Sequence, residues 1–232
     1  MRPVQFRNEF FASAEADDLA ALMPVMREVT LRVGQVLYEP GELIDVVYFP
    51  STSVIAVVMT SKDGHDIQLS SAGYEGVAGL AQAVANQPPF TRLQVQIGGG
   101  AIAVPAAVLR AKSFSSAGLM ALVLRFIKAA VDQSELTVAC IASHQLAPRL
   151  ARWLLTCGDR MNSSKIALTQ EEMGMMAGAL RGSISLTASE LKGAGLIAYS
   201  RGHLEILDRP RLERLACECY RSHRVFFDQP AA

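Results

Sequence analysis

Between positions 169 and 201, the sequence brings together cationic and small polar residues that are able to bind nucleic acid. Arg181 can present its planar guanidinium group to O6 and N7 of a guanine, and the alternative is a solvated charge at a helix start. Leu186 can contact a thymine methyl group or, equally well, pack against a neighbouring helix. The other candidates suit hydrogen bonds to bases or phosphates: Thr169, Gln170, Ser183, Ser185, Ser200 and Arg201.

Two short helices are needed to position these side chains. Thr169 is a favourable N-cap, and Glu172 completes a capping box three positions later. Gly178 follows where a helix-turn-helix needs a residue that tolerates positive φ. A second helix is predicted from about Arg181. Its inward-facing residues recur at helical spacing: Ile184, Ala188 and Leu191.

A hairpin is predicted directly after the second helix. Gly195 ends that helix, and residues 199–203, with the sequence Tyr-Ser-Arg-Gly-His, indicate a strand, a tight turn and a second strand. Thr169 and Gln170 at the first helix start, and Ser200 and Arg201 at the hairpin tip, suit phosphate contacts. Helix, turn, helix and basic hairpin within residues 168–207 predict a winged helix-turn-helix that binds double-stranded DNA.

The region before this module has a different pattern. Short β-rich runs separated by glycine, aspartate and serine extend from Val29 to about Val104, which is typical of a barrel or sandwich. Residues 62–65, with the sequence Lys-Asp-Gly-His, indicate a hairpin turn between two of these runs.

A long helix is predicted after Pro105, because apolar residues recur at three- and four-residue intervals from Leu119 to Ile141. This stripe can pack on the preceding domain, but its width favours a second role in a homodimer, with Phe126 and Ile127 in the interface. A further helix is predicted from Leu150 to Thr156. Pro148 would lie in its first turn, and Gly158 would end it.

Composition limits the function classes. The 232-residue chain has no net charge, but the part from Ile141 onward has a slight basic excess and the preceding part a slight acidic excess. No signal-peptide pattern and no membrane-spanning apolar run is visible, which predicts a cytoplasmic protein without a membrane partner. No catalytic triad, metalloprotease, Walker or dinucleotide motif is found, so we expect no catalytic residues.

The four cysteines lack paired metal-ligand spacing. Cys217 and Cys219, with His223 nearby, are the one combination that could hold a metal. Two closely spaced thiolates and one histidine do not complete a tetrahedral site. We therefore expect buried or incidental thiols, no metal and no cofactor.

These patterns together resemble the Crp/Fnr family of transcription regulators. The resemblance depends on residues 149–155 (Arg-Leu-Ala-Arg-Trp-Leu-Leu), 168–171 (Leu-Thr-Gln-Glu) with Gly178, 195–197 (Gly-Leu-Ile) and 199–202 (Tyr-Ser-Arg-Gly). The glycines of the β-rich region, Gly34, Gly41, Gly64 and Gly76, resemble those of that family's sensor domain.

The resemblance implies an α+β fold with three parts. A sensor β-barrel of the cyclic-nucleotide-binding-like jelly-roll type would occupy residues 1–116, a dimerisation helix 117–143, and the winged helix-turn-helix 144–232. It also implies a homodimer with both recognition helices on one operator, and contact with RNA polymerase if the protein is an activator.

The effector expected from the resemblance is a small molecule other than cyclic AMP. Members that bind cyclic AMP carry a Gly-Glu pair and then an Arg-Ser or Arg-Thr pair, whereas Thr91 here precedes the lone Arg92, which cannot supply converging phosphate donors. An iron-sulfur sensor is not expected because no cysteine precedes Cys140, and haem is not expected because His65 lies in a turn. The implied site contains Gly73, Glu75, Gly76, Arg92, Ser134 and Glu135.

Two alternatives remain open. An empty sensor domain that binds DNA constitutively is as compatible with the sequence as an effector-controlled one. A winged helix that binds a protein instead of DNA is the second alternative, because the basic excess of the C-terminal part is small. Salt-dependent DNA binding would separate this alternative from a DNA-binding regulator.

Overall fold

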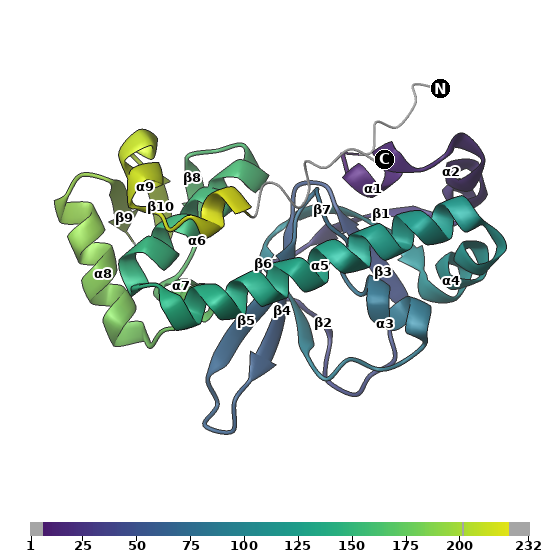
Figure 1. The fold of residues 1–232 in the computed structure, drawn as a ribbon, viewed down its shortest axis with the longest axis horizontal. Coiled ribbons are helices and arrows are strands. Elements are labelled where there is room, and N and C mark those ends of the chain that lie inside the picture. Colours follow the sequence, from purple (N-terminus) through teal and green to yellow (C-terminus); the bar gives the residue numbers. More distant parts are fainter. Residues whose placement is uncertain (1–6, 201, 223–232) are drawn as a thin grey trace. The chain divides into compact units, whose positions relative to one another are not determined.

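A computed structural model describes residues 7–200 and 202–222 (Figure 1). The chain divides into two compact units, and each is described by itself. The first unit contains residues 1–58 and 70–131, and the second contains residues 59–69 and 132–232. The long helix α5 (Ala117–Ser143) contributes residues to both units.

Two sheets form from the β-rich region. The three-stranded sheet has the order β1-β7-β3, and the four-stranded sheet has the order β2-β6-β4-β5. The described strands thus form two separate sheets, and the expected closed barrel is not confirmed. Their bounds are β1 Arg27–Leu31, β2 Val36–Tyr38, β3 Val46–Pro50, β4 Val54–Thr60, β5 Asp66–Ala72, β6 Arg92–Ile97 and β7 Gly99–Pro105.

The predicted turn between β4 and β5 is confirmed. The Ser61 N–H donates to the His65 carbonyl at 2.8 Å, and Gly64 has a φ of 78°. Glycine adopts this left-handed conformation without the steric cost that a side chain would add.

Short helices and the first half of α5 complete the first unit. Its core is rich in aromatic contacts. The ring centroid of Phe10 lies 5.0 Å from that of Phe49 and 5.2 Å from that of Phe126. Leu119, Val123 and Phe126 of α5 are buried in this same core. The other helices are α1 Glu9–Ser13, α2 Ala16–Leu22, the 3-10 helix η1 Met23–Val25, α3 Leu80–Ala85 and α4 Ala106–Ser115.

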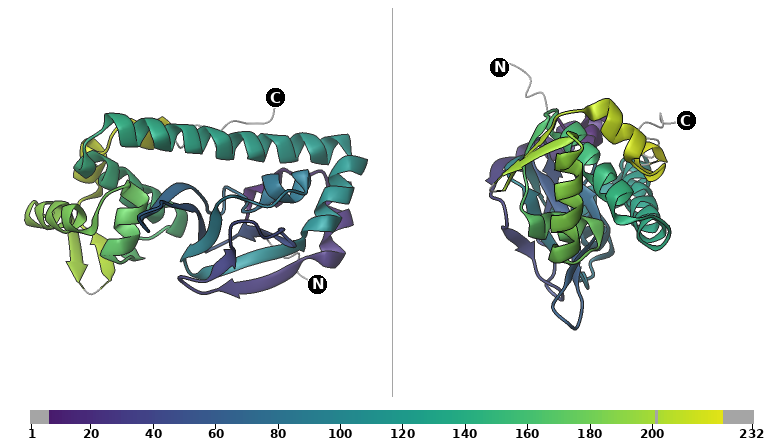
Figure 2. Two further views of the ribbon diagram at one scale, coloured as in Figure 1. Left: turned by 90° about the horizontal axis from the view of Figure 1, so that it is seen from below. Right: turned by 90° about the vertical axis from the view of Figure 1, so that its left-hand side faces the viewer.

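The second unit is a helical domain with a small antiparallel sheet of order β8-β10-β9. Figure 2 (left) shows β9 and β10 as adjacent arrows beside α8. Residue 203 of β10 pairs with Ser200 of β9 and with Ala167 of β8. The elements are α6 Leu146–Met161, β8 Lys165–Ala167, α7 Gln170–Ala177, α8 Arg181–Gly193, β9 Ile197–Ser200, β10 His203–Ile206 and α9 Arg209–Leu215.

Helix α6 is longer than the sequence predicts. Pro148 lies in its first turn as expected, but the helix continues through Gly158 to Met161, and the C-cap Asn162 has a φ of 48°. A Cβ on Gly158 would lie 3.2 Å from the Ser163 carbonyl oxygen and 3.3 Å from Ile206 Cδ1. This glycine therefore permits close packing and does not end the helix, which corrects our prediction.

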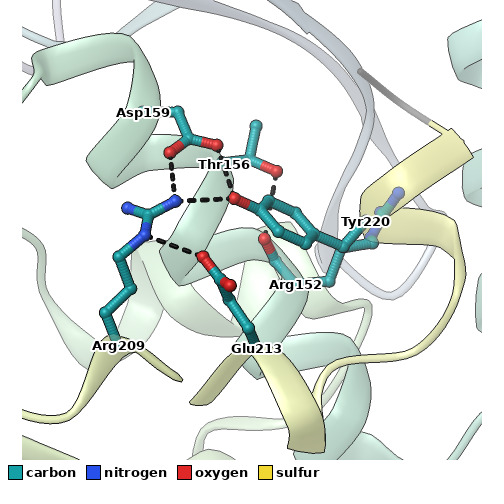
Figure 3. Close-up of polar contacts among 6 residues, drawn as sticks. All are labelled: Arg152, Thr156, Asp159, Arg209, Glu213 and Tyr220. Carbon is teal, nitrogen blue, oxygen red and sulfur yellow. Dashed lines mark hydrogen bonds and ion pairs between the residues drawn. The ribbon is translucent and has the colours of Figure 1, made fainter. Parts of the chain in front are cut away.

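Polar contacts hold the segment after α9 against α6 (Figure 3). The Arg209 guanidinium donates to Asp159 at 2.5 Å, to the Tyr220 hydroxyl oxygen at 2.7 Å and to Glu213 at 2.8 Å. The Tyr220 hydroxyl in turn donates to Asp159 at 2.7 Å. Burial, followed by the hydrogen bond to Asp159, raises the pKa of Tyr220 to about 12, so this donor stays protonated at neutral pH.

No described helix combines the length and the apolar character that crossing a lipid bilayer requires.

Candidate nucleic-acid interface

Helix α7 begins as predicted. The Thr169 side chain accepts a hydrogen bond from the Glu172 N–H at 3.1 Å, and Glu172 Oε2 accepts one from the Thr169 N–H at 2.5 Å, so the capping box is confirmed. The Thr169 hydroxyl also donates to Glu172 at 2.9 Å. The Thr169 hydroxyl thus acts both as a hydrogen-bond donor and as an acceptor within the helix cap.

The turn between α7 and α8 depends on two glycines. Gly178 has a φ of 59°, as its predicted role requires, and a Cβ there would lie 3.0 Å from Ile141 Cδ1. Gly174, which the sequence analysis missed, lies inside α7, where a Cβ would approach the Ala179 carbonyl oxygen to 2.8 Å. The Ala179 N–H donates to the Gly174 carbonyl at 3.0 Å, so the chain crosses itself closely here.

Helix α8 begins at Arg181 and separates its faces as predicted. Ile184, Ala188 and Leu191 are buried on the inner face. Leu186 is 70% exposed, so it does not pack against a neighbouring helix of the described unit, which was the alternative to a DNA contact. Elsewhere on α8, Arg181 and Ser183 are exposed and Ser185 is half-buried.

The predicted hairpin is present as β9 and β10. Gly202 has a φ of 80°, and its carbonyl accepts from the Leu168 N–H at 2.9 Å, which joins the hairpin to the start of α7. Ser200 is exposed, and Arg201 lies outside the described residues. His203 is also exposed and lies opposite Ser200 in the strand register. His203 was not among the predicted DNA contacts, although its position directly after the turn glycine places it at the hairpin tip.

These elements place Arg181, Ser183, Ser185 and Leu186 on one helix, with Gln170 and Ser200 on neighbouring elements of the same unit. The α8 surface combines donors, hydroxyl groups and one apolar side chain. Such a combination can read base edges, which display acceptors, donors and the thymine methyl group. The exposed residues around it can contact phosphates.

The predicted effector residues fall into both units. In the first unit, Glu75 is buried and accepts a hydrogen bond from the Gly73 N–H at 3.2 Å, while the Gly76 N–H donates to the Gly73 carbonyl at 3.0 Å. Arg92 is half-buried on β6. Ser134 and Glu135 belong to the second unit, so the two halves of this predicted site are described separately.

Asn8 is a further residue at this turn that the sequence analysis missed. Its side-chain amide donates to the Pro50 carbonyl at 2.8 Å and to the Gly76 carbonyl at 3.0 Å. Its Oδ1 also accepts from the Phe10 N–H, capping α1. Asn8 therefore anchors α1 to the turn that contains Gly73, Glu75 and Gly76.

Helix α5 carries a second apolar line besides the one buried in the first unit. Leu124, Val131 and Val138 are 57%, 49% and 65% exposed and recur every seven residues. Seven-residue spacing places side chains along one line of a helix and is typical of helix pairing. Phe126 is 8% exposed within its own unit's core, so its expected place in a dimer interface is not supported.

Comparison with known proteins identifies the C-terminal module. Residues 148–215 match the family model of the Crp-like helix-turn-helix domain. Comparison with curated proteins found no match.

Solved structures share the fold over most of the chain. A CRP-family transcriptional regulator from Thermus thermophilus is 21% identical, with 82% of this chain and 96% of that chain covered at a TM-score of 0.68. A crp/fnr-family regulator from Eubacterium rectale is 16% identical, with coverages of 90% and 98% and a TM-score of 0.72. FixK2 from Bradyrhizobium japonicum is 17% identical, with coverages of 83% and 98% and a TM-score of 0.71.

The resemblance inferred from the sequence is therefore confirmed. Residues 148–215 thus form a Crp-like helix-turn-helix domain, and the chain shares its fold with solved structures of Crp/Fnr-family transcription regulators.

Proposed function

We propose that this protein is a cytoplasmic homodimer that binds a specific DNA operator through the outer face of α8. The observation that carries the proposal is the separation of faces on α8. Ile184, Ala188 and Leu191 fix the helix to its unit, while Arg181 and Leu186 remain exposed. A helix that is fixed in this way can enter a major groove and present its outer side chains to base edges.

Each outer residue has a distinct role in this proposal. Arg181 pairs with O6 and N7 of a guanine, Leu186 contacts a thymine methyl group, and Ser183 and Ser185 form hydrogen bonds to base edges or adjacent phosphates. Gln170, Ser200 and Arg201 contact phosphates. Thr169 positions α7 through its capping box, because its hydroxyl is already engaged with Glu172.

Dimerisation is proposed to use the exposed line of Leu124, Val131 and Val138 on α5. Three apolar side chains at seven-residue intervals suit pairing with the same helix of a second copy. We expect Val138→Glu to give folded monomers in light scattering, because pairing would bury an uncompensated charge. The matched control Phe126→Ala should instead lose about 3–5 kcal/mol of stability, since it removes a core aromatic. A Val138→Glu variant that stays dimeric would contradict this interface.

The effector is proposed to be a small molecule other than cyclic AMP. The support is the sequence around Arg92, where Thr91 precedes the arginine, so that the converging donors needed by a cyclic phosphate are not supplied. The turn of Gly73, Glu75 and Gly76 remains part of the proposed site. Arg92, Ser134 and Glu135 remain the other proposed contacts. RNA polymerase is the proposed further partner if the protein activates transcription.

Selection of operator fragments from genomic DNA, followed by binding measurements at several salt concentrations, tests the proposed function. We expect affinity for the selected fragment to fall steeply with salt, with a slope of about −0.9 per phosphate contacted. A scrambled duplex serves as the control and should bind far more weakly. If no fragment is enriched, or if binding does not depend on salt, the winged helix is better explained as a protein-binding module.

A further inference from the structure

Three cysteines and one histidine gather at one place in the second unit, and none of them belongs to α8. They are Cys140 on α5, His144 just after α5, and Cys217 and Cys219 after α9. One possible ligand atom from each lies within 4.8 Å of all the others. The Sγ atoms of Cys140 and Cys217 are 3.6 Å apart, and Cys219 Sγ is 3.8 Å from His144 Nδ1.

Local structure explains why the four side chains converge. The His144 N–H donates to the Cys140 carbonyl at 3.1 Å, so these residues lie one helical turn apart on the same face. Cys217 and Cys219 flank a turn in which the Tyr220 N–H donates to the Cys217 carbonyl at 3.0 Å. The contacts of Tyr220 with Arg209 and Asp159 hold that turn against α6 (Figure 3).

His144 is oriented as a metal-binding histidine would be. Its Nε2 lies 3.0 Å from Glu218 Oε1, while its Nδ1 faces Cys219. Histidines that bind a metal through one ring nitrogen usually donate the other ring N–H to a carboxylate or carbonyl. Glu218 therefore fixes the tautomer that leaves Nδ1 free to act as a ligand.

A buried cation provides an independent observation. Arg152 on α6 is 1% exposed, and its Nε and Nη2 have no hydrogen-bond partner among the described residues. Its guanidinium lies over the Trp153 ring and is within electrostatic range of Cys140, Cys217 and Cys219. A buried unpaired charge is costly unless compensating charge lies nearby. Three neutral thiols do not supply that charge, whereas three thiolates around a divalent cation do.

We propose that Cys140, His144, Cys217 and Cys219 bind one Zn²⁺ ion in a tetrahedral structural site. Binding replaces three thiol protons, which leave to solvent, with bonds from three thiolates and from neutral His144 to the metal. The resulting centre carries one net negative charge, which Arg152 balances. A site with four protein ligands leaves no open position for a substrate, so its role is structural.

The spacing of the donors favours one zinc ion over other occupants. With Zn–S bonds of about 2.3 Å, tetrahedral geometry places two sulfurs about 3.8 Å apart, close to the 3.6 Å between Cys140 and Cys217. An iron-sulfur cluster holds ligands on different iron atoms, with sulfide between them, and four donors that all lie within 4.8 Å of one another leave no room for it. Mg²⁺ and Ca²⁺ prefer oxygen ligands.

The ion would join the end of α5 to the segment after α9. Cys217 lies 77 positions after Cys140, and every element from α6 to α9, including α8 and the β9–β10 hairpin, lies between them. Because the four ligands come together only in the folded unit, the free energy of metal binding would add to the free energy of folding. The site would therefore stabilise the second unit whether or not the unit reads DNA in the proposed way.

Metal analysis of the full-length protein, purified from medium supplemented with zinc, tests this site. We expect about one zinc per chain in the native protein and close to none in Cys219→Ser and in His144→Gln. Cys157→Ser is the matched control, because Cys157 is also buried in the second unit but lies outside the cluster. This control should retain full zinc content.

Replacement of the ion by Co²⁺ provides a second measurement that does not depend on purification history. The native protein and Cys157→Ser should develop the intense visible absorption of tetrahedral thiolate-bound cobalt, and Cys219→Ser should not. Glu218→Gln should keep the site but weaken metal affinity by about 10- to 100-fold, because it removes only the carboxylate that orients His144.

Two outcomes would overturn the proposal. One is a folded native protein that neither retains zinc nor takes up Co²⁺. The other is a disulfide between Cys140 and Cys217, found by peptide mapping under non-reducing conditions in protein kept free of oxidants. If Cys219→Ser fails to fold, the half-buried His144→Gln variant and the cobalt spectrum of the native protein still decide the question.

Discussion

The outer face of α8 and the turn formed by Gly73, Glu75 and Gly76 use their polar groups in opposite ways. On α8, Arg181 and Ser183 are exposed while the inner face is buried. In the turn, Glu75 is buried and accepts a hydrogen bond from Gly73. A polar side chain that forms hydrogen bonds with the nearby backbone stabilises the fold. A polar side chain that is exposed on a well-packed helix is available to bind a partner.

The largest expected effect concerns the scaffold beneath α8. Ile184→Ala should lower the free energy of unfolding by about 2–5 kcal/mol, because it removes most of a fully buried side chain. Leu186→Ala, two positions away and exposed, should change it by less than about 0.5 kcal/mol. Urea denaturation followed by fluorescence reports on this unit, since Trp153 is the one tryptophan of the chain. Equal losses for the two variants would remove the distinction between the two faces.

The turn in the first unit should respond mainly in stability. Asn8→Ala removes the donors to the Pro50 and Gly76 carbonyls and the cap of α1, and we expect a loss of about 1–3 kcal/mol in thermal unfolding. Asn8→Ser keeps an N-cap acceptor but not the two amide donors, and it adds no charge at this buried position, so it separates these contributions. Without effector, DNA affinity of either folded variant should remain native, and a loss of affinity at unchanged stability would show that Asn8 does more than anchor this turn.

Arg181→Ala should show the reverse pattern. Stability should stay native because the side chain is exposed. Affinity for the operator should fall by about 1–3 kcal/mol, with specificity relaxed at one base pair of each half-site. Binding to operator and scrambled duplexes measures both quantities, and an equal loss on the two duplexes would contradict base reading by Arg181.

Local signals explain which parts of the fold could be predicted from the sequence. The capping box of Thr169 and Glu172, the turn at Gly178 and the inward residues of α8 each depend on neighbours within a few positions, and the structure contains all three. The hairpin turn at Gly64 was predictable for the same reason.

Long-range packing explains the features that were missed. Gly158 was expected to end α6, but its role depends on Ile206, which lies on a different strand. Phe126 was assigned to a dimer interface, because the stripe on α5 does not reveal that Phe126 packs against Phe10 in the core of the first unit. His223 was the histidine considered as a further metal ligand beside Cys217 and Cys219, because it is close in sequence. His223 lies outside the described residues, and the side chains that lie near the two cysteines in the structure are those of Cys140 and His144.

The smallest expected effect tests whether Thr169 belongs to the scaffold or to the DNA-binding surface. Thr169→Ala should lower stability by about 0.5–2 kcal/mol, as loss of an N-cap usually does. That variant alone does not decide the role of Thr169, because a frayed α7 would also weaken DNA binding.

Thr169→Asp separates the two roles, because aspartate is also a good N-cap but adds a negative charge. If Thr169 only caps α7, the aspartate variant should keep both stability and DNA affinity, apart from a small salt-dependent loss from long-range repulsion. If its side chain touches a phosphate, operator and scrambled duplexes should both lose affinity strongly while stability stays native. Because the hydroxyl already donates to and accepts from Glu172, we expect the first result.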